Sequence, residues 1–448
     1  MIILLILVFC LFYLFVYFLI KNRPNRFPLT FYVVWWLFWL IISSFNPYNL
    51  YNVSFQTYLL LLVNIFMFTI GYFLVISKKK KLNQPKIFSF DINNKWIFIL
   101  QLPLLSILFY YFIKYNMLLN SLNIIEARNI KYQIGFLFST PLEYMFNIII
   151  IEPLMSITML LFSIKLFRKK SKDFTTLLMA FNIFLSSQIG LGRLVFFELM
   201  VYLFVTYIVF KSMSIKENAQ KLKGKTYLKE QSHKGKLKAV TLIILIFVLV
   251  TGMAYITMLR RGISVFTIDT LMEGYSLLFR QTIVYFVGPF RSLDYLINSD
   301  IINIYGLFWG KLTFGGIENL VGYIFLFLDP NYKIANYVIG PLTQNPITIG
   351  NGVEFNAFYT SLMNYYLDFN IIGVLIIPLI YGMINAYITN LFLRKTNIVT
   401  LMLFIFITYQ SIASSFRWNF QFPGSWIVIL ILVILGIIIK KNNYLKEK

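Results

Sequence analysis

The sequence predicts an all-α, polytopic integral membrane protein with about 11 transmembrane helices and one large outer loop. Three observations predict this fold class. The chain of 448 residues is 59% hydrophobic and 19% aromatic, only 13% of its residues are charged, and its mean hydropathy is +0.75. Apolar runs of about 20 residues, the length that crosses the hydrocarbon core of a bilayer, recur along the chain. Basic clusters alternate with loops of little positive excess between these runs.

The first apolar run, MIILLILVFCLFYLFVYFLI, is expected to be a retained span and not a signal peptide. No basic segment precedes it, and no small-residue cleavage site follows it. The single cysteine, Cys10, lies inside this run. The sequence therefore predicts no intramolecular disulfide and no thiolate metal site.

Eleven spans are expected along the chain. They lie near 2–20, 28–44, 55–77, 95–114, 143–167, 174–190, 194–210, 239–258, 370–392, 397–414 and 425–440. Basic clusters on one side of these spans are 21–26, 78–86, 168–172, 211–238, 394–396 and the C-terminal tail. The positive-inside rule makes that side cytoplasmic, so the N-terminus is expected outside and the C-terminus inside. The net charge of +23 is then a topology signal that contacts anionic lipid, and no nucleic-acid partner is expected.

This topology divides the chain into three parts. They are an N-terminal bundle of eight spans over 1–258 with the basic cytoplasmic loop 211–238, a large extracytoplasmic loop over 259–369, and a C-terminal bundle of three spans with a basic tail over 370–448. Within the large loop, QTIVYFVGPF (281–290) and GYIFLFL (322–328) are too short to span, and Gly288-Pro289 interrupts the first. Such stretches are typical of interfacial or re-entrant helices.

Arginine and lysine are distributed unequally between the two predicted sides. The cytoplasmic side has 25 lysines and 4 arginines, whereas the outer side has 4 lysines and 7 arginines. The outer arginines are Arg128, Arg193, Arg260, Arg261, Arg280, Arg291 and Arg417. An arginine fork binds carboxylate or phosphate bidentately, and a lysine does not. The bias indicates an outer face that binds anions. For some of the seven arginines, the alternative is an ion pair with a carboxylate of the outer loops.

The stretch SSQIGLGRLVFFELM (186–200) places two charges among apolar residues. Arg193 lies at the outer mouth of the span 194–210, and Glu198 lies deeper. Ionisable residues inside a membrane are costly and typical of functional sites, although an arginine at the mouth can also extend to the interface. Because residues five apart on a helix differ by about 140° in direction, we expect each of the two to have a separate partner.

The outer side offers a restricted set of chemical groups. The only histidine, His233, is in the cytoplasmic loop, and no Gly-rich phosphate loop occurs. Arginine, lysine, tyrosine and carboxylate suffice for substitution at a carbon that bears a diphosphate leaving group. A lipid-linked diphosphate sugar is the expected substrate, with no metal and no soluble cofactor. Glu273, Glu354 and Asp368 are equally good candidates for the base, and Asp368 has the alternative of capping the span at 370.

Several aromatic residues of the outer side are candidates for stacking on sugar rings or for anchoring at the interface. They are Tyr285, Phe290, Trp309, Tyr359 and Tyr366.

Five motifs occur in a characteristic order. They are GLGRLVFFELMVYL (190–203), RRG (260–262), YFVGPFRSLDYL (285–296), YGLFWGKLTFGGIENLV (305–321) and NAFYTSLMNYYLDFNIIGVLIIPLIYGMI (356–384). With one large outer loop, this set resembles the oligosaccharide repeat unit polymerases, the Wzy or O-antigen polymerase family, over roughly residues 180–392. The resemblance implies a GT-C-like membrane glycosyltransferase. Such an enzyme joins undecaprenyl-diphosphate-linked repeat units into O-antigen, capsule or exopolysaccharide at the outer face of the bacterial cytoplasmic membrane.

The resemblance also implies roles for single residues. Diphosphate binding falls to Arg193, Arg260, Arg261, Arg280 and Arg291, and sugar binding or positioning to Tyr285 and Asn356. Tyr366, an aromatic residue of the outer loop, is a further candidate for sugar binding. Asp368 lies in a matching motif, and Asn370 stands where the family usually has glycine. The implied partners are the undecaprenyl-diphosphate-linked oligosaccharide, membrane lipid, a chain-length regulator and a flippase.

Three alternatives remain open. A lipid-linked oligosaccharide flippase is expected to have paired halves and midplane charges, and neither is evident in the sequence. A transferase similar to the O-antigen ligases differs only in its acceptor. A noncatalytic membrane scaffold would leave the outer arginine bias without an explanation.

Overall fold

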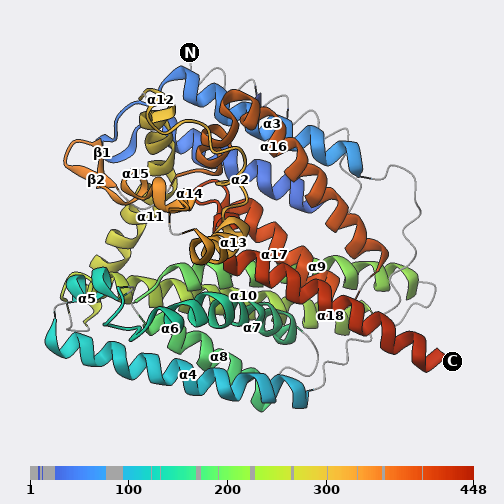
Figure 1. The fold of residues 1–448 in the computed structure, drawn as a ribbon. Helices are drawn as coiled ribbons and strands as arrows, with labels where there is room; N and C mark the ends of the chain where they lie inside the picture. The colour runs from blue at the N-terminus through green and yellow to red at the C-terminus, as the bar shows by residue number, and fades with distance from the viewer. Residues whose placement is uncertain are drawn as a thin grey trace. The chain divides into compact units, whose positions relative to one another are not determined.

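The computed structural model describes residues 9–10, 13, 26–76, 94–122, 124–131, 133–167, 173–189, 191–221, 228–263, 267–299, 301–329, 331–355, 359–395 and 397–447. These residues are almost entirely helical, with one two-stranded sheet (Figure 1). The fold is that of a helical, multi-pass membrane protein. The chain divides into two compact units, Met1–Ser89 with Arg280–Lys448, and Phe90–Phe279.

The helices of the first unit come from both ends of the chain. They are α2 (Phe27–Ser44), α3 (Phe55–Val75), α12 (Ile301–Tyr305), α13 (Gly315–Leu328), α14 (Ala335–Val338), α15 (Gly340–Gln344), α16 (Ser361–Arg394), α17 (Ile398–Ala413) and α18 (Pro423–Glu447). Short 3-10 turns occur at Pro47–Asn49 and Asn419–Gln421. Strands β1 (Ile347–Gly350) and β2 (Val353–Phe355) pair antiparallel, with Ile347 opposite Phe355.

The second unit is built from the middle of the chain. It contains α4 (Asn94–Ser121), α5 (Ile124–Ile130), α6 (Pro141–Phe146), the π-helical turn Asn147–Ile151, α7 (Glu152–Leu166), α8 (Phe174–Gln188), α9 (Leu194–Lys221) and α10 (Leu228–Leu259). Helix α11 (Ile268–Ile297) begins in this unit and continues into the other one.

Seven helical segments of the described chain are long and apolar enough to cross a membrane. They are Phe27–Ser44, Phe55–Val75, Asn94–Ser121, Pro141–Leu166, Leu194–Ser212, Val240–Leu259 and Ser361–Arg394. The expected spans at 174–190, 397–414 and 425–440 correspond to shorter apolar helices, Phe174–Gln188, Ile398–Ala413 and Pro423–Ile438. Of the expected span 2–20, only residues 9, 10 and 13 are described. Helices α9 and α10 extend into the segment 211–238 that was expected to be a loop, and residues 222–227 lie outside the described chain.

The tightest helix pair in the first unit is α3 with α16, which lie side by side in Figure 1. Two glycines permit this approach. A Cβ on Gly71 would lie 1.9 Å from the Leu379 carbonyl oxygen, and a Cβ on Gly382 would lie 2.1 Å from the Phe68 carbonyl oxygen. Backbone contact at this distance is possible only without side chains, as is common between transmembrane helices.

Helix α11 corrects one prediction about the outer loop. The sequence predicted an interruption at Gly288-Pro289, but the helix continues through both residues to Ile297. Gly288 instead allows close packing, because a Cβ there would lie 2.9 Å from the Phe355 ring. Val287, Phe290 and Leu293 on the same helix are fully buried. This burial offsets the backbone hydrogen bond that a proline inside a helix removes.

Helix α16 is broken near its start. Phe369 has φ −141° and ψ 17°, and Asn370 has φ 53° and ψ −143°, so the helical run Ser361–Arg394 contains two segments. The expected start of a span at 370 therefore coincides with the break. The Asp368 carboxylate accepts hydrogen bonds from the backbone N–H groups of Leu312 (3.1 Å) and Thr313 (2.6 Å), which lie before α13 and not in the helix that follows the break.

Candidate functional site

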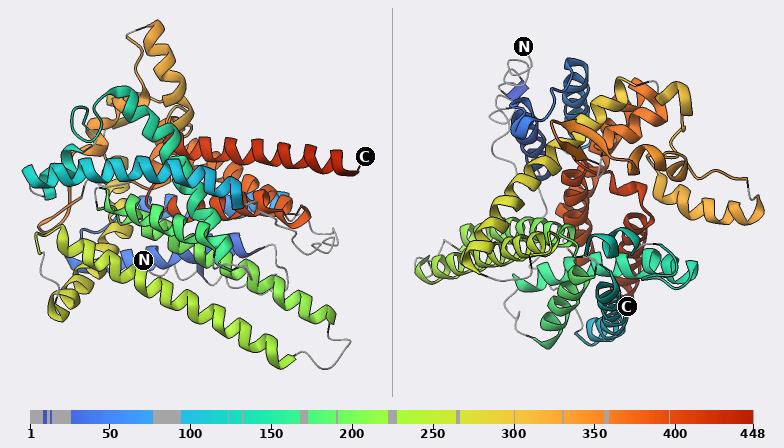
Figure 2. Two further views of the ribbon diagram at one scale, coloured as in Figure 1. Left: turned by 90° about the horizontal axis from the view of Figure 1, so that it is seen from below. Right: turned by 90° about the vertical axis from the view of Figure 1, so that its left-hand side faces the viewer.

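Two arginines link the bend between α8 and α9 to the end of α10. The Arg193 guanidinium donates to Thr257 Oγ1 at 3.0 Å, and the Arg260 guanidinium donates to the Leu191 carbonyl oxygen, with Nε at 3.1 Å. Leu191 has a left-handed backbone, with φ 50°. Helices α9 and α10 lie side by side and antiparallel, since the start of one meets the end of the other (Figure 2). We call Arg193, Arg260 and Arg261 the arginine corner.

The RRG motif ends α10. Gly262 has φ 77°, and its N–H donates to the Leu259 carbonyl oxygen at 2.9 Å, which is typical of a glycine that terminates a helix. Arg261 is exposed beside it. Cations at a helix C-terminus are stabilised by the helix dipole, so the pair also has a structural function.

A hydrophobic cluster supports the arginine corner. Its buried members are Tyr111, Tyr115, Ala127, Leu137, Phe138, Leu191, Phe196 and Ile256. Two members of this cluster contact Arg260. The Leu191 carbonyl accepts from the Arg260 guanidinium, and the Ile256 carbonyl accepts from the Arg260 backbone N–H. A guanidinium beside such a cluster is less screened by water, so its attraction for an anion is stronger than at an open surface.

Glu273 belongs to the same unit as the arginine corner. The next residue, Gly274, packs on α10, because a Cβ there would lie 2.9 Å from the Met258 side chain. The Tyr275 hydroxyl lies 2.5 Å from Thr251 Oγ1. The first part of α11 is thus fixed against the last turns of α10, and Glu273 is exposed in this part of α11.

Arg280 and Glu354 lie in the other unit. The exposed Arg280 guanidinium is 5.5 Å from the centre of the Tyr48 ring. Tyr48 belongs to a loop in which Asn46, Tyr48 and Asn49 all have positive φ. Glu354 is exposed on β2, and the hairpin of β1 and β2 is bonded to this loop through Tyr51, whose N–H donates to the Ile349 carbonyl at 2.8 Å.

Arg291 does not fit the predicted role in diphosphate binding. Its side chain is only 4% exposed, and all five N–H groups donate within the protein. The acceptors are the Tyr51 carbonyl (2.9 Å), Ser43 Oγ (3.0 Å), the Val287 carbonyl (3.0 Å), the Ser43 carbonyl (3.1 Å) and Asn46 Oδ1 (3.1 Å). Burial lowers the pKa of Arg291 to about 10, which leaves it charged at neutral pH. Arg291 therefore fixes the end of α2 and the loop after it, and no donor remains for a ligand.

Asp368 does not fit the predicted role of general base. It is 0% exposed, and its two carboxylate oxygens accept from the backbone of the turn before α13. A base must reach the proton that it removes, and this carboxylate is enclosed by the turn. Asp368 is instead a positioning residue for Leu312 and Thr313.

The predicted sugar-binding residues have different surroundings. Tyr285 is half-buried, with its ring centre 5.5 Å from that of Phe416. Tyr366 is half-buried on α16, and Asn356 lies outside the described residues. Phe290 and Tyr359 are buried in the unit, so neither offers a ring face to a sugar, whereas Trp309 is widely exposed.

Glu318, near the start of α13, is a partly buried carboxylate outside the predicted site. Its Oε1 accepts from the Tyr332 hydroxyl and the Ala335 N–H, both at 3.2 Å, whereas Oε2 is buried with no hydrogen-bond partner among the described residues. Burial raises the pKa of this carboxyl above its ordinary value. The signal in the sequence was GGIENL, in which two glycines precede the glutamate: a Cβ on Gly316 would lie 2.4 Å from the Phe422 carbonyl oxygen.

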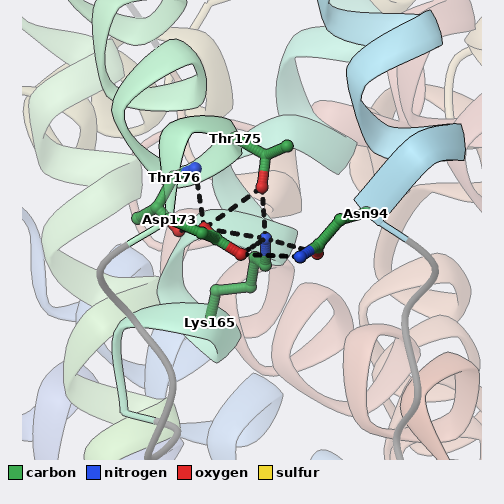
Figure 3. Close-up of polar contacts among 5 residues, drawn as sticks. All are labelled: Asn94, Lys165, Asp173, Thr175 and Thr176. Carbon is green, nitrogen blue, oxygen red and sulfur yellow. Dashed lines mark hydrogen bonds and ion pairs between the residues drawn. The ribbon is translucent and has the colours of Figure 1, made fainter.

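A cluster of charged and polar side chains around the buried Lys165 joins α4, α7 and α8 (Figure 3). The Lys165 ammonium bonds to Asp173 at 2.8 Å and to Asn94 Oδ1 at 3.0 Å, and Thr176 Oγ1 donates to Asp173 at 2.6 Å. Burial raises the pKa of Asp173, but the bonds from Lys165 and Thr176 outweigh it and hold the pKa well below its ordinary value. These groups satisfy one another, so the cluster fixes helix ends and offers no open site.

The described part of the chain contains no group of three or more histidine, cysteine, aspartate or glutamate residues placed to hold a metal ion. The candidate site consists of the arginine corner, with Glu273 exposed on the part of α11 that packs against α10. Comparison with known proteins finds no matching protein-family model, no matching curated protein and no matching solved structure.

Proposed function

We propose that this chain is a membrane-embedded glycosyltransferase that polymerises lipid-linked diphosphate oligosaccharides at the outer face of the bacterial cytoplasmic membrane. The arginine corner carries the proposal. Arg193 and Arg260 are held by their contacts with Thr257 and Leu191, on a hydrophobic cluster, with Arg261 exposed beside them. Guanidinium groups held in advance stabilise the charge that develops on a departing diphosphate.

The reaction needs one base and one leaving group. An acceptor hydroxyl oxygen forms a bond to the anomeric carbon of the donor saccharide, and the bond from that carbon to the diphosphate oxygen breaks. The diphosphate takes the electron pair and is stabilised by the arginine corner. The hydroxyl proton passes to Glu273, which is exposed on the part of α11 that packs against α10, and from there to water.

Deletion of the gene in its own host tests the class of activity. The measurement is the size and membrane sidedness of lipid-linked saccharides and surface glycan. Single repeat units on the outer face, with no long chains, are the result expected of a lost polymerase. Long chains that stay on the lipid would instead indicate a ligase, and units retained on the cytoplasmic face would indicate a flippase.

Arginine-to-lysine replacements test the site. Arg193→Lys and Arg260→Lys keep the charge and lose the fork, so long glycan is expected to fall about tenfold or more at an unchanged protein level. Arg394→Lys, at the exposed end of α16, is the matched control and should leave glycan length unchanged. Wild-type chain length in both test variants would refute the role of the arginine corner.

A further inference from the structure

The turn before α13 holds an exposed tryptophan in a strained backbone. Gly306, Trp309 and Gly310 have φ of 72°, 54° and 90°. This left-handed region costs glycine nothing, but it is a genuine outlier for a bulky residue. Trp309 is 72% exposed, so burial of its indole does not offset the cost. Such strain persists only where the surroundings impose it, and it is frequent at binding sites.

Buried polar side chains impose this turn. The Asp368 carboxylate accepts from the Leu312 and Thr313 N–H groups. Asn364 donates to the Leu312 carbonyl at 2.9 Å, and the Trp418 indole donates to the Thr313 carbonyl at 2.8 Å. The turn is thus fixed to α16 and to the segment after α17, and Trp309 is held outward.

The same turn presents a cation two residues further on. Lys311 is exposed, and its ammonium lies 5.4 Å from the centre of the Tyr332 ring. No oxygen atom in the described part of the chain accepts a hydrogen bond from the Lys311 ammonium or the Trp309 indole N–H. One short turn therefore carries two exposed hydrogen-bond donors, and one of them is charged.

An apolar ridge begins where this turn meets α16. The Trp309 and Phe369 ring centres are 6.1 Å apart, and Phe369 with Asn370 forms the break in α16. Beyond the break, isoleucines recur every four residues on the exposed side of the helix, namely Ile372, Ile376, Ile380 and Ile384. Residues four apart form one ridge, and twelve residues of helix extend about 18 Å. That length is close to one leaflet of hydrocarbon, about 15 Å.

We propose that the Trp309–Lys311 turn binds the phosphate group of a membrane lipid whose hydrocarbon chain lies along this ridge. The Lys311 ammonium and the Trp309 indole N–H donate to the phosphate, and the indole ring covers the first carbons of the chain. This inference rests on the proposed function for the identity of the lipid, because joining two lipid-linked saccharides requires a second lipid-phosphate site besides the arginine corner. A structural phospholipid has the same chemistry and is the other source.

Photolabelling of the full-length protein in nanodiscs tests the site. The probe is a polyprenyl diphosphate with a photoreactive group in its chain, and the readout is labelling of the peptide that contains Ile372–Ile384. Lys311→Gln and Trp309→Leu are expected to lower this labelling by about tenfold, the size of one charge-assisted hydrogen bond. Lys333→Gln, another exposed lysine, and Trp96→Leu, another exposed tryptophan, are the matched controls. Unchanged labelling in both test variants would overturn the proposal.

Two further arms complete the experiment. Trp309→Gly removes the indole, and glycine adopts the positive φ of this position without strain. This variant is expected to lose labelling and to keep the thermal stability of the wild type, which would exclude misfolding as the cause. Excess phosphatidylglycerol that abolishes labelling would assign the site to a phospholipid, and labelling that survives it would assign the site to the diphosphate substrate. The readout needs no polymerisation, so a failure here is distinguishable from a failure of the proposed function.

Discussion

Asn370 occupies a backbone conformation that suits glycine. Its φ of 53° and ψ of −143° are unfavourable for a residue with a Cβ, and asparagine tolerates positive φ better than most residues. We expect Asn370→Gly to match or exceed the wild type in stability and Asn370→Ala to lower the free energy of unfolding by roughly 1 kcal/mol. Thermal unfolding in detergent measures both, with Ile371→Ala as the neighbouring control. Equal stability of the Gly and Ala variants would contradict the assigned conformation.

Glu318 is expected to make stability depend on pH. Burial raises the pKa of its carboxyl in the folded chain above the ordinary value of 4.5, so the unfolded chain releases this proton first. Protonation of Glu318 contributes fully to the free energy of unfolding below pH 4.5. This contribution is lost as the pH rises through the pKa of the folded chain, by at most about 1.4 kcal/mol per pH unit. The difference in unfolding free energy between wild type and Glu318→Gln should therefore shrink with rising pH. A constant difference would show that Glu318 does not titrate in this way.

At the residue scale, the sequence does not reveal the partners of single polar side chains, because these partners are remote in the chain. The partners of Arg193 and Arg260 lie 64 and 69 residues away. Arg291 and Asp368 were assigned to chemistry because their partners are remote in sequence. Ser43 is 248 residues from Arg291, and Thr313 is 55 residues from Asp368. No pattern close to Arg291 or Asp368 in the sequence shows that their side chains are fully hydrogen-bonded within the protein.

At the scale of elements, the pair α3 and α16 depends on two glycines. Gly71→Ala and Gly382→Ala each place a methyl group within about 2 Å of a backbone oxygen, so we expect each to lower the free energy of unfolding by roughly 2 kcal/mol or more. Gly436→Ala in α18 is the control, because its Cβ would meet the nearest atom, in Val399, at 3.6 Å. Thermal unfolding in detergent compares the three. A Gly382→Ala protein as stable as the control would refute the close crossing.

The positions of the helices were largely predictable from the apolar runs. In the hydrocarbon core of a membrane the backbone N–H and C=O groups of such a run must bond to one another, and a helix satisfies them. The predictions of where single helices break or end were wrong at two places. Gly288-Pro289 predicts a break, yet the burial of Val287 and Phe290 stabilises α11 across it. The basic segment 211–238 predicts a loop, but lysine is a good helix former, and α9 and α10 extend into the segment.

At the scale of the whole molecule, the compact units do not follow chain order. Residues Met1–Ser89 join Arg280–Lys448, whereas Phe90–Phe279 form a unit of their own. Composition and charge alternation report where a chain crosses a membrane, and they carry no information on which crossings pack together. The fold class was therefore within reach of the sequence, and the grouping of helices was not.

Sidedness is the property of the whole molecule on which the proposed substrate depends. The alternation of basic clusters predicts that segment 259–369 is outside and segment 211–238 inside. In a Cys10→Ser background, a membrane-impermeant maleimide should label Lys333→Cys in intact cells and label Lys225→Cys only after the membrane is opened. The reverse pattern would place the turn of Trp309 and Lys311 in the cytoplasm, where saccharides still await export. A polymerase of exported units would then be excluded, whatever anions the arginines bind.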